Sequence, residues 1–304
     1  MIKVTWQGVY PALTTKMKED HSLDLPAFKK HVEFQMNNGI LGLILGGSLG
    51  EASTLKLDEI IALLSSAKEI TGEHIPVLIN IAESSTSDAI KVAQTAESNG
   101  ADGLMLLPPM RYKADDHETV VYFKSVADAT SLPIMIYNNP HDYKIAVTID
   151  MFEQLTLHQN IQAVKESSRD ITTVTRMINA FGSRFKIMGG VDTLALECLV
   201  AGADGWVGGL VNAFPAETVS IFNLIKKGRI DDALIIYRWF MPLLELDIHP
   251  KLVQYIKLAE AAAGVGTEHV RPPRLKLTGI ERIQVLSIIN DAIQTRPNLK
   301  IYDI

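Results

Sequence analysis

The sequence predicts an α/β protein, a (β/α)₈ TIM barrel followed by a C-terminal helical subdomain. Eight short apolar runs bounded by turn residues alternate with segments of helical periodicity, which is typical of a parallel sheet whose strands are joined by helices. Eight such strands indicate a closed barrel. The expected strands are residues 8–13, 42–45, 76–81, 103–107, 133–137, 161–165, 185–188 and 205–207.

Three junctions between a helix and the next strand share one sequence unit. Residues 38–42 (Asn-Gly-Ile-Leu-Gly), 99–103 (Asn-Gly-Ala-Asp-Gly) and 201–205 (Ala-Gly-Ala-Asp-Gly) each end a helix with glycine and then enter an apolar run. Glycine adopts the left-handed conformation that ends many helices at no steric cost. We therefore interpret these glycines as structural.

After Pro215 the pattern is helical only, so the last part of the chain adds no strand to the barrel. We expect a catalytic barrel over residues 1–225 and a helical extension over residues 226–304. No flexible linker separates the two, which predicts that the extension packs on the barrel. The segment Val-Arg-Pro-Pro at 270–273 is expected to interrupt the helices, because proline cannot continue a helix.

The composition favours a small dissolved substrate. Of the 304 residues, 47% are hydrophobic and 21% are charged, and the net charge of -6 is spread without long like-charged runs. Such a distribution is not the footprint of a protein that binds nucleic acid or an anionic membrane. No stretch stays apolar for the roughly 20 residues of a membrane span, and the first ten residues lack the apolar core of a signal peptide. We expect a cytoplasmic protein.

Neither a metal nor a nucleotide cofactor is expected. The eight histidines are scattered, and no two of them have the spacing of metal ligands. The glycine-rich turn at 46–50 lacks the Gly-x-Gly-x-x-Gly spacing of a dinucleotide site, and no P-loop lysine follows it. The single cysteine, Cys198, lies in a helical apolar pattern, and we interpret it as a buried structural side chain.

In a parallel barrel the reactive groups lie at the carboxyl ends of the strands. Lys165 ends the expected strand 161–165. Apolar surroundings disfavour its charged form, and a neutral lysine can attack a carbonyl or imine carbon. A lysine that pairs with a neighbouring carboxylate fits the same position equally well. Tyr137 ends the preceding strand, where its phenol could transfer a proton or simply cap the core.

Two further features lie on the same expected face. The turn at 46–50, which includes Gly47, presents backbone N–H groups at the start of a helix, and such groups suit a carboxylate. Glycines in a turn also serve to make a corner. His141 follows Pro140 on an active-face loop, where it could contact substrate or be an ordinary loop residue.

Together the motifs Gly-Gly-Ser-Leu-Gly-Glu at 46–51, Tyr-Asn-Asn-Pro at 137–140 and Val-Lys-Glu-Ser at 164–167 resemble the dihydrodipicolinate synthase and N-acetylneuraminate lyase family. The resemblance extends from about residue 8 to the C-terminal helices. It implies a class I aldolase-type mechanism without a cofactor, and a homodimer or homotetramer.

The resemblance also implies roles for individual residues. Lys165 would form the Schiff base and Tyr137 would relay protons. Ser48 and the N–H group of Leu49 would hold the carboxylate of the substrate. Val207 falls where the family lines the pyruvyl pocket.

Departures from the family pattern indicate a subtype other than the synthase. The synthase has an arginine after Tyr-Asn-x-Pro that holds the carboxylate of its second substrate, whereas this chain has Asp142, which would repel it. The segment Pro-Pro-Met-Arg-Tyr at 108–112 has Arg111 in place of a proton-relaying tyrosine. Ser48 and Leu49 replace two adjacent threonines.

These features look most like the 1-pyrroline-4-hydroxy-2-carboxylate deaminases of hydroxyproline breakdown, which yield 2,5-dioxopentanoate and ammonia. Arg111 would then contact the polar end of the substrate, unless it forms a surface or interface ion pair. Two other family activities stay open: dehydration or cleavage of a 2-oxo-3-deoxy sugar acid, and synthesis of 4-hydroxy-tetrahydrodipicolinate. A non-catalytic barrel that binds a metabolite is the alternative from a different class.

Overall fold

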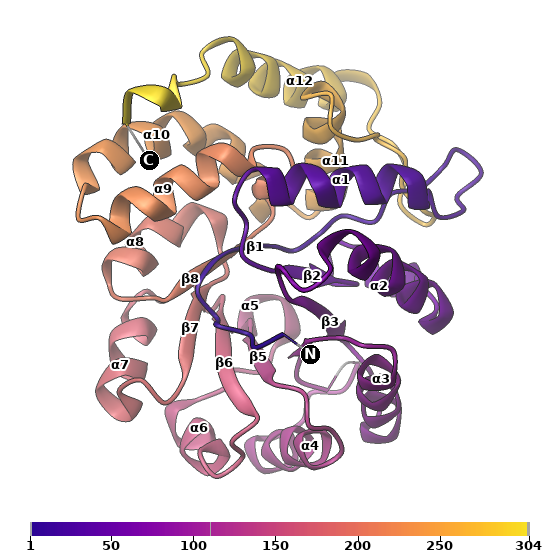
Figure 1. Cartoon of the computed structure of the whole chain (residues 1–304), viewed down its shortest axis with the longest axis vertical. Coiled ribbons are helices and arrows are strands. Elements are labelled where there is room, and N and C mark those ends of the chain that lie inside the picture. Colours follow the sequence, from indigo (N-terminus) through magenta and orange to yellow (C-terminus); the bar gives the residue numbers. More distant parts are fainter. Residues whose placement is uncertain (1, 110, 303–304) are drawn as a thin grey trace.

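The chain forms a closed parallel barrel surrounded by helices, as the sequence predicts (Figure 1). The computed structural model describes residues 2–109 and 111–302, so Met110 of the segment at 108–112 lies outside the described residues. Each expected strand is present within two residues of its expected ends. The strands are β1 (Gly8–Pro11), β2 (Leu43–Leu45), β3 (Val77–Ile81), β4 (Gly103–Leu106), β5 (Ile134–Asn138), β6 (Ile161–Glu166), β7 (Lys186–Gly189) and β8 (Gly205–Gly208).

Neighbouring strands pair in parallel all the way around the sheet, in the order β1-β8-β7-β6-β5-β4-β3-β2. The barrel closes between β1 and β2. There Ala12 forms a parallel bridge with Ile44, and the N–H of Leu13 donates to the carbonyl of Ile44 at 2.9 Å. Closure leaves no edge strand, and it brings the carboxyl ends of all eight strands around one opening.

Helices connect the strands and cover the outside of the barrel (Figure 1). Several begin at residues that cap the free N–H groups of the first turn. The Ser85 hydroxyl accepts from the N–H of Asp88, and Asp115 and Glu118 cap each other's backbone. The connecting helices are α1 (Leu25–Asn37), α2 (Leu57–Thr71), α3 (Thr86–Ser98), α4 (Asp116–Asp128), α5 (Pro140–Tyr143), α6 (Ile149–Leu155), α7 (Thr172–Phe181) and α8 (Ala195–Val200).

The glycines of the repeated junction are structural. Gly39, Gly100 and Gly202 have φ angles of 84°, 84° and 113°, the region that favours glycine. The aspartates of the same unit have a role that the sequence pattern did not reveal. Asp102 accepts from the N–H of Val77, and Asp204 accepts from the N–H of Ile187, each at 2.9 Å. Each aspartate therefore ties the start of its own strand to the preceding strand.

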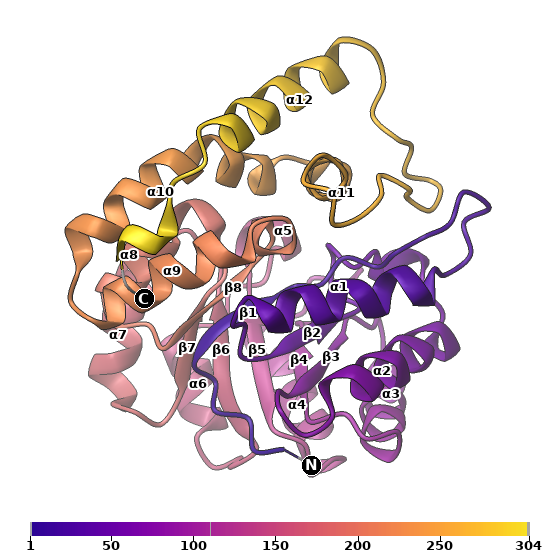
Figure 2. The ribbon, with the colours of Figure 1, turned by 45° about the horizontal axis from the view of Figure 1, so that its top comes forward.

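The chain after Pro215 is helical, and Figure 2 shows α11 and α12 above the end of the barrel where α5 lies. The interruption expected at 270–273 is confirmed, since no helix covers these residues. The division of the chain at residue 225 stays a prediction. The C-terminal helices are α9 (Pro215–Lys226), α10 (Ile230–Leu244), α11 (Leu252–Ala262) and α12 (Gly279–Gln294), and a short 3₁₀ helix, η4 (Glu245–Ile248), precedes α11.

Two fully buried ion pairs attach α11 to the barrel. Lys16, which follows β1, pairs with Glu260 at 2.7 Å, and Lys257 pairs with Glu51, which follows β2. Buried charges need such partners because burial removes their hydration. The helix that follows η4 is therefore held in a fixed position above the strands.

Cys198 is a buried side chain of α8, as predicted, and burial raises the pKa of its thiol to about 12. Among the described residues, no helix is both long enough and apolar enough to span a membrane.

Candidate active site

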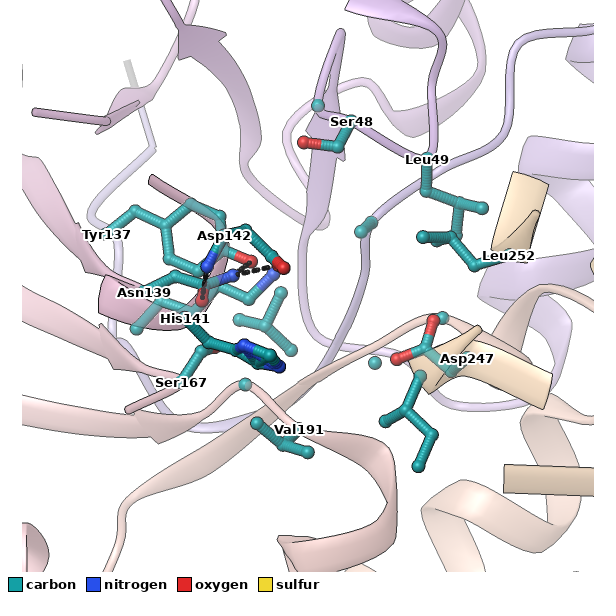
Figure 3. Close-up of a pocket in the computed structure, with 18 of the residues that line it drawn as sticks. Ser48, Leu49, Tyr137, Asn139, His141, Asp142, Ser167, Val191, Asp247 and Leu252 are labelled. Carbon is teal, nitrogen blue, oxygen red and sulfur yellow. Dashed lines mark hydrogen bonds between the residues drawn. The ribbon is translucent and has the colours of Figure 1, made fainter. Parts of the chain in front are cut away.

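A cavity of about 510 Å³ opens at the carboxyl ends of the strands (Figure 3). It brings together seven of the eight residues that the sequence predicts for the site. Its remaining walls come from α5, from the loops after β6 and β7, and from the segment that contains η4. The predicted residues that line it are Gly47, Ser48, Leu49, Tyr137, His141, Lys165 and Val207.

Lys165 lies near the end of β6, directly beside Tyr137 of β5 in the register of the sheet. Its ammonium nitrogen is 4.2 Å from the centroid of the Tyr137 ring. Burial lowers the pKa of Lys165, and attraction to Asp247 only partly offsets this effect. A lowered pKa makes the neutral, nucleophilic amine easier to reach at neutral pH.

The next residue, Glu166, does not pair with this lysine. Its carboxylate accepts from Asn138 Nδ2 at 2.9 Å and from the N–H of Ser168 at 2.6 Å. The buried lysines that do form ion pairs in the described chain are Lys16 and Lys257. Within the described residues Lys165 forms no ion pair, although Asp247 attracts its charge, so pairing with a carboxylate inside the barrel stays the alternative for this lysine.

Glycine at position 190 makes room for the Lys165 side chain. A Cβ atom at Gly190 would lie 2.7 Å from Cγ of Lys165 and 2.8 Å from its Cε. Any larger residue at the end of β7 would displace the lysine. The position of Lys165 thus depends on two adjacent strands.

The phenol of Tyr137 is held by the loop that begins α5. Asn139 Nδ2 donates to the Tyr137 oxygen at 3.1 Å and to Asp142 Oδ2 at 2.7 Å. Burial raises the pKa of Tyr137 to about 12, so the phenol keeps its proton at neutral pH. The Tyr137 side chain lines the cavity (Figure 3).

The turn after β2 presents two free backbone N–H groups. Within the described part of the chain, the N–H groups of Ser48 and Leu49 have no acceptor. The Ser48 hydroxyl is 2.6 Å from the hydroxyl of Tyr143. Glu51 ends the turn in a left-handed conformation, with φ of 62°, and its buried carboxylate accepts from the N–H of Arg271 at 2.9 Å. The turn thus offers free N–H groups of the kind that bind a carboxylate in proteins.

Arg111 is the predicted residue that lies elsewhere. It is exposed and lines a neighbouring cavity of about 410 Å³, which shares Ser48 and Tyr143 with the first cavity. The sequence placed Arg111 near the substrate only through a family resemblance. In the structure, Arg111 does not line the cavity that contains Lys165.

Several polar residues that line the cavity were not predicted from the sequence, and three of them matter for its chemistry. Tyr143 belongs to α5, Arg169 follows β6, and Asp247 comes from η4 in the C-terminal part. The helix start at Pro140 was a usable signal for Tyr143, because a short helix there returns the chain to the cavity. Nothing in the helical tail pointed to Asp247. No cluster of three potential metal ligands occurs within residues 2–109 and 111–302.

An α/β barrel with a cavity at the carboxyl ends of its strands is the arrangement of enzymes that act on small molecules. The chain belongs to the dihydrodipicolinate synthetase family, whose model matches residues 5–292. It is accordingly a class I aldolase-type lyase, as the motifs indicated.

Similar proteins cover nearly the whole chain. The 4-hydroxy-tetrahydrodipicolinate synthase of Exiguobacterium sibiricum is 33% identical over 275 residues, which are 90% of this chain and 92% of the relative. A dihydrodipicolinate synthase structure from Bacillus anthracis has a TM-score of 0.91 and 25% identity, and it covers 98% of this chain and 100% of its own. The 4-hydroxy-tetrahydrodipicolinate synthase of Methylacidiphilum fumariolicum has a TM-score of 0.88 and 27% identity, with 96% and 98% covered.

Proposed function

We propose that Lys165 forms a Schiff base with its substrate, and that this substrate is 1-pyrroline-4-hydroxy-2-carboxylate. The products are 2,5-dioxopentanoate and ammonia. Ser48 and the N–H of Leu49 hold the substrate carboxylate, and Val207 forms an apolar wall. Tyr137 transfers protons at the carbon next to the imine.

The observation that carries this choice is the carboxylate of Asp142 beside Tyr137. Asn139 joins the two by donating to both, so a negative charge stands at this edge of the cavity. A synthase would bind the carboxylate of a second substrate in this region, and like charges repel at short range. A single small cyclic substrate with one carboxylate, bound at the turn after β2, avoids that conflict.

The reaction follows from the position of the amine. The neutral amine of Lys165 adds to the C2=N carbon of the ring, and the C2–N bond to the ring nitrogen breaks, which leaves an open chain bound as a Schiff base. Tyr137 helps to move a proton from C3, and the enamine expels the hydroxyl group from C4 as water. Proton transfer from C5 back to C3 then moves the new double bond until the C5 amine has become an imine, and two water molecules hydrolyse the imines at C2 and C5. One water molecule is consumed overall, and ammonia carries away the ring nitrogen.

Ammonia release from 1-pyrroline-4-hydroxy-2-carboxylate tests the substrate. We expect release by the wild-type protein and none by Lys165→Ala, which stays folded but has lost the nucleophile. Turnover of a 2-oxo-3-deoxy sugar acid without ammonia release from the pyrroline would reject the deaminase. A mass adduct on Lys165 after borohydride reduction tests the Schiff base itself.

Synthesis of 4-hydroxy-tetrahydrodipicolinate is the second candidate, and Arg169 favours it. This exposed arginine lines the cavity and could hold a second carboxylate. The relatives named above also carry that activity in their names. This candidate is favoured if the protein consumes pyruvate only when aspartate 4-semialdehyde is added. It is favoured further if Arg169→Gln no longer consumes pyruvate under the same conditions. Aspartate 4-semialdehyde is the co-substrate because it supplies the carbon atoms of 4-hydroxy-tetrahydrodipicolinate that do not come from pyruvate.

We also propose a cytoplasmic homodimer or homotetramer. Ile280 and Ile283 of α12 are 75% and 68% exposed, and such apolar side chains favour association. Light scattering on an eluting column peak measures the assembly, and a monomer at micromolar concentration would contradict this proposal.

A further inference from the structure

The C-terminal part of the chain contributes a carboxylate to the cavity of Lys165. Asp247 lies in η4, and it faces the cavity from the side opposite Tyr137 (Figure 3). It is half-buried, and within the described residues its carboxylate oxygens accept no hydrogen bond from the protein. A carboxyl group that lines the cavity of Lys165 and has no protein donor is available to exchange protons with a bound substrate.

Glycine at position 209 admits this carboxylate. A Cβ atom at Gly209 would lie 2.1 Å from Oδ1 of Asp247 and 2.9 Å from its Cγ. The backbone after β8 and the side chain from η4 are therefore in close contact. Gly209 contacts the Asp247 side chain closely, as Gly190 contacts the Lys165 side chain. In both places the lack of a Cβ atom leaves room for the side chain that lines the cavity.

A second carboxylate, Asp192, also contacts Gly209 but has several hydrogen-bond donors. It accepts from Trp206 Nε1 at 2.9 Å, from the N–H of Gly209 at 3.1 Å and from the N–H of Leu210 at 2.8 Å. These hydrogen bonds hold the Asp192 carboxylate in place, so we assign it a structural role. Asp247 has none of them, and it faces the substrate space.

The surroundings of Asp247 favour its protonated form. Burial and the nearby negative charge of Asp192 raise the pKa of Asp247 well above its usual range, although attraction to Lys165 opposes the rise. A carboxyl group with a raised pKa exchanges protons more readily near neutral pH than a phenol with a pKa of about 12, such as Tyr137.

We propose that Asp247 is the general acid that protonates the group leaving C2 of the substrate when Lys165 forms its Schiff base. This inference rests on the proposed Schiff base at Lys165. It applies both to a 2-oxo acid and to a cyclic imine, because each loses a poor leaving group from the same carbon.

With pyruvate, the Lys165 nitrogen bonds to C2 and a proton moves from nitrogen to the carbonyl oxygen. The C2–O bond then breaks, its electron pair stays on oxygen, and the Asp247 proton completes a water molecule. With a cyclic imine, the C2–N ring bond breaks instead, and the ring nitrogen takes the proton. The Asp247 carboxylate regains a proton from the water that later hydrolyses the Schiff base, so each cycle is balanced.

The rate of covalent capture of pyruvate tests this role without the natural substrate. Protein is mixed with pyruvate, quenched with borohydride at set times, and the adduct on Lys165 is measured by mass spectrometry. We expect Asp247→Asn to slow capture about 100-fold, the lower end of the effect of a general acid. The matched control is Glu245→Gln, an exposed acid of the same short helix, which should capture at the wild-type rate.

The direction of the change separates catalysis from simple charge pairing. If Asp247 served only as a counter-ion, its replacement by asparagine would lower the pKa of Lys165 further, enlarge the neutral fraction and speed capture. Equal or faster capture by Asp247→Asn overturns the inference. Formate added to Asp247→Ala should restore part of the rate, a rescue that a structural role would not produce, and a failure of formate to restore any rate also counts against the acid. Absence of any adduct on the wild-type protein overturns the proposed function, and this inference with it.

Discussion

The Ser48 hydroxyl lies 2.6 Å from the phenol oxygen of Tyr143, which joins the turn after β2 to helix α5 across the mouth of the cavity. The Tyr143 ring also meets the Tyr137 ring edge-on, with 5.6 Å between centroids. Tyr143 therefore positions two residues that we assign to substrate binding and proton transfer.

Replacing Tyr143 by phenylalanine should weaken substrate binding. The variant keeps the ring contact but loses the hydrogen bond that orients Ser48, which is worth about 1 kcal/mol, or roughly fivefold in affinity. We predict a rise of about that size in KM for a 2-oxo acid or cyclic imine, measured by steady-state kinetics. Tyr122→Phe removes a buried hydroxyl that has no partner among the described residues, and it should leave KM unchanged.

The rate of covalent capture at Lys165 should have a bell-shaped dependence on pH. It rises as the lysine amine loses its proton, with a midpoint below pH 10.5, the usual pKa of lysine, and it falls at higher pH once Asp247 has lost the proton that it donates. Only the neutral amine attacks, and burial lowers the pKa of Lys165 despite attraction to Asp247, Tyr143, Asp192 and Asp142. The initial rate of pyruvate adduct formation, followed between pH 6 and pH 11 at about equal steps, measures this profile. A midpoint at or above 10.5 would show that the negative groups outweigh burial.

The barrel was predictable because its signals are local. Each strand is a short apolar run, and each junction carries a glycine stop, so all eight strands could be expected within two residues of their observed ends. Lys165 and Tyr137 could be expected for the same reason, since each lies near the carboxyl end of a strand.

The rest of the site depends on how distant segments pack. Asp247 reaches the cavity because η4 folds back over β8, where Gly209 leaves space, and no periodicity in residues 245–248 encodes that contact. Arg111 shows the limit of a motif. The family resemblance suggested that it contacts the substrate, whereas in the structure it lines the neighbouring cavity, and its role stays a prediction.

Removing Lys16 should destabilise the protein strongly. Lys16→Met leaves the carboxylate of Glu260 buried without its cation, and we predict a loss of about 3–5 kcal/mol in the free energy of unfolding. The double variant Lys16→Met with Glu260→Leu should recover part of that loss, because no unpaired charge remains. Chemical denaturation measures both values.

The exposed pair Lys29 and Glu69 provides the control for this prediction. Lys29→Met also removes a lysine from an ion pair, but solvent screens that pair, so we expect a change below about 1 kcal/mol. Similar losses for Lys16→Met and Lys29→Met would mean that the buried pair contributes no more than a surface pair.

His31 should make stability depend on pH between about 4 and 6.5. The imidazole is fully buried beside Lys16 and Glu260, and burial together with the charge of Lys16 lowers its pKa from 6.5 to about 4. In that interval the unfolded chain binds a proton that the folded chain does not, so stability falls as the pH falls. The contribution of the neutral His31 to the free energy of unfolding is fully present above pH 6.5. About 2 kcal/mol of this contribution is lost by roughly pH 5.

Comparison with His31→Gln isolates this contribution from the carboxylates that titrate in the same range. The free energy of unfolding of each protein is measured by denaturant at about pH 7.5 and about pH 5. We expect the wild-type protein to lose about 2 kcal/mol more than the variant, because glutamine has no proton to gain. Equal losses would indicate that His31 is protonated in the folded protein, in which case the imidazolium would be a third charge in the cluster of Lys16 and Glu260.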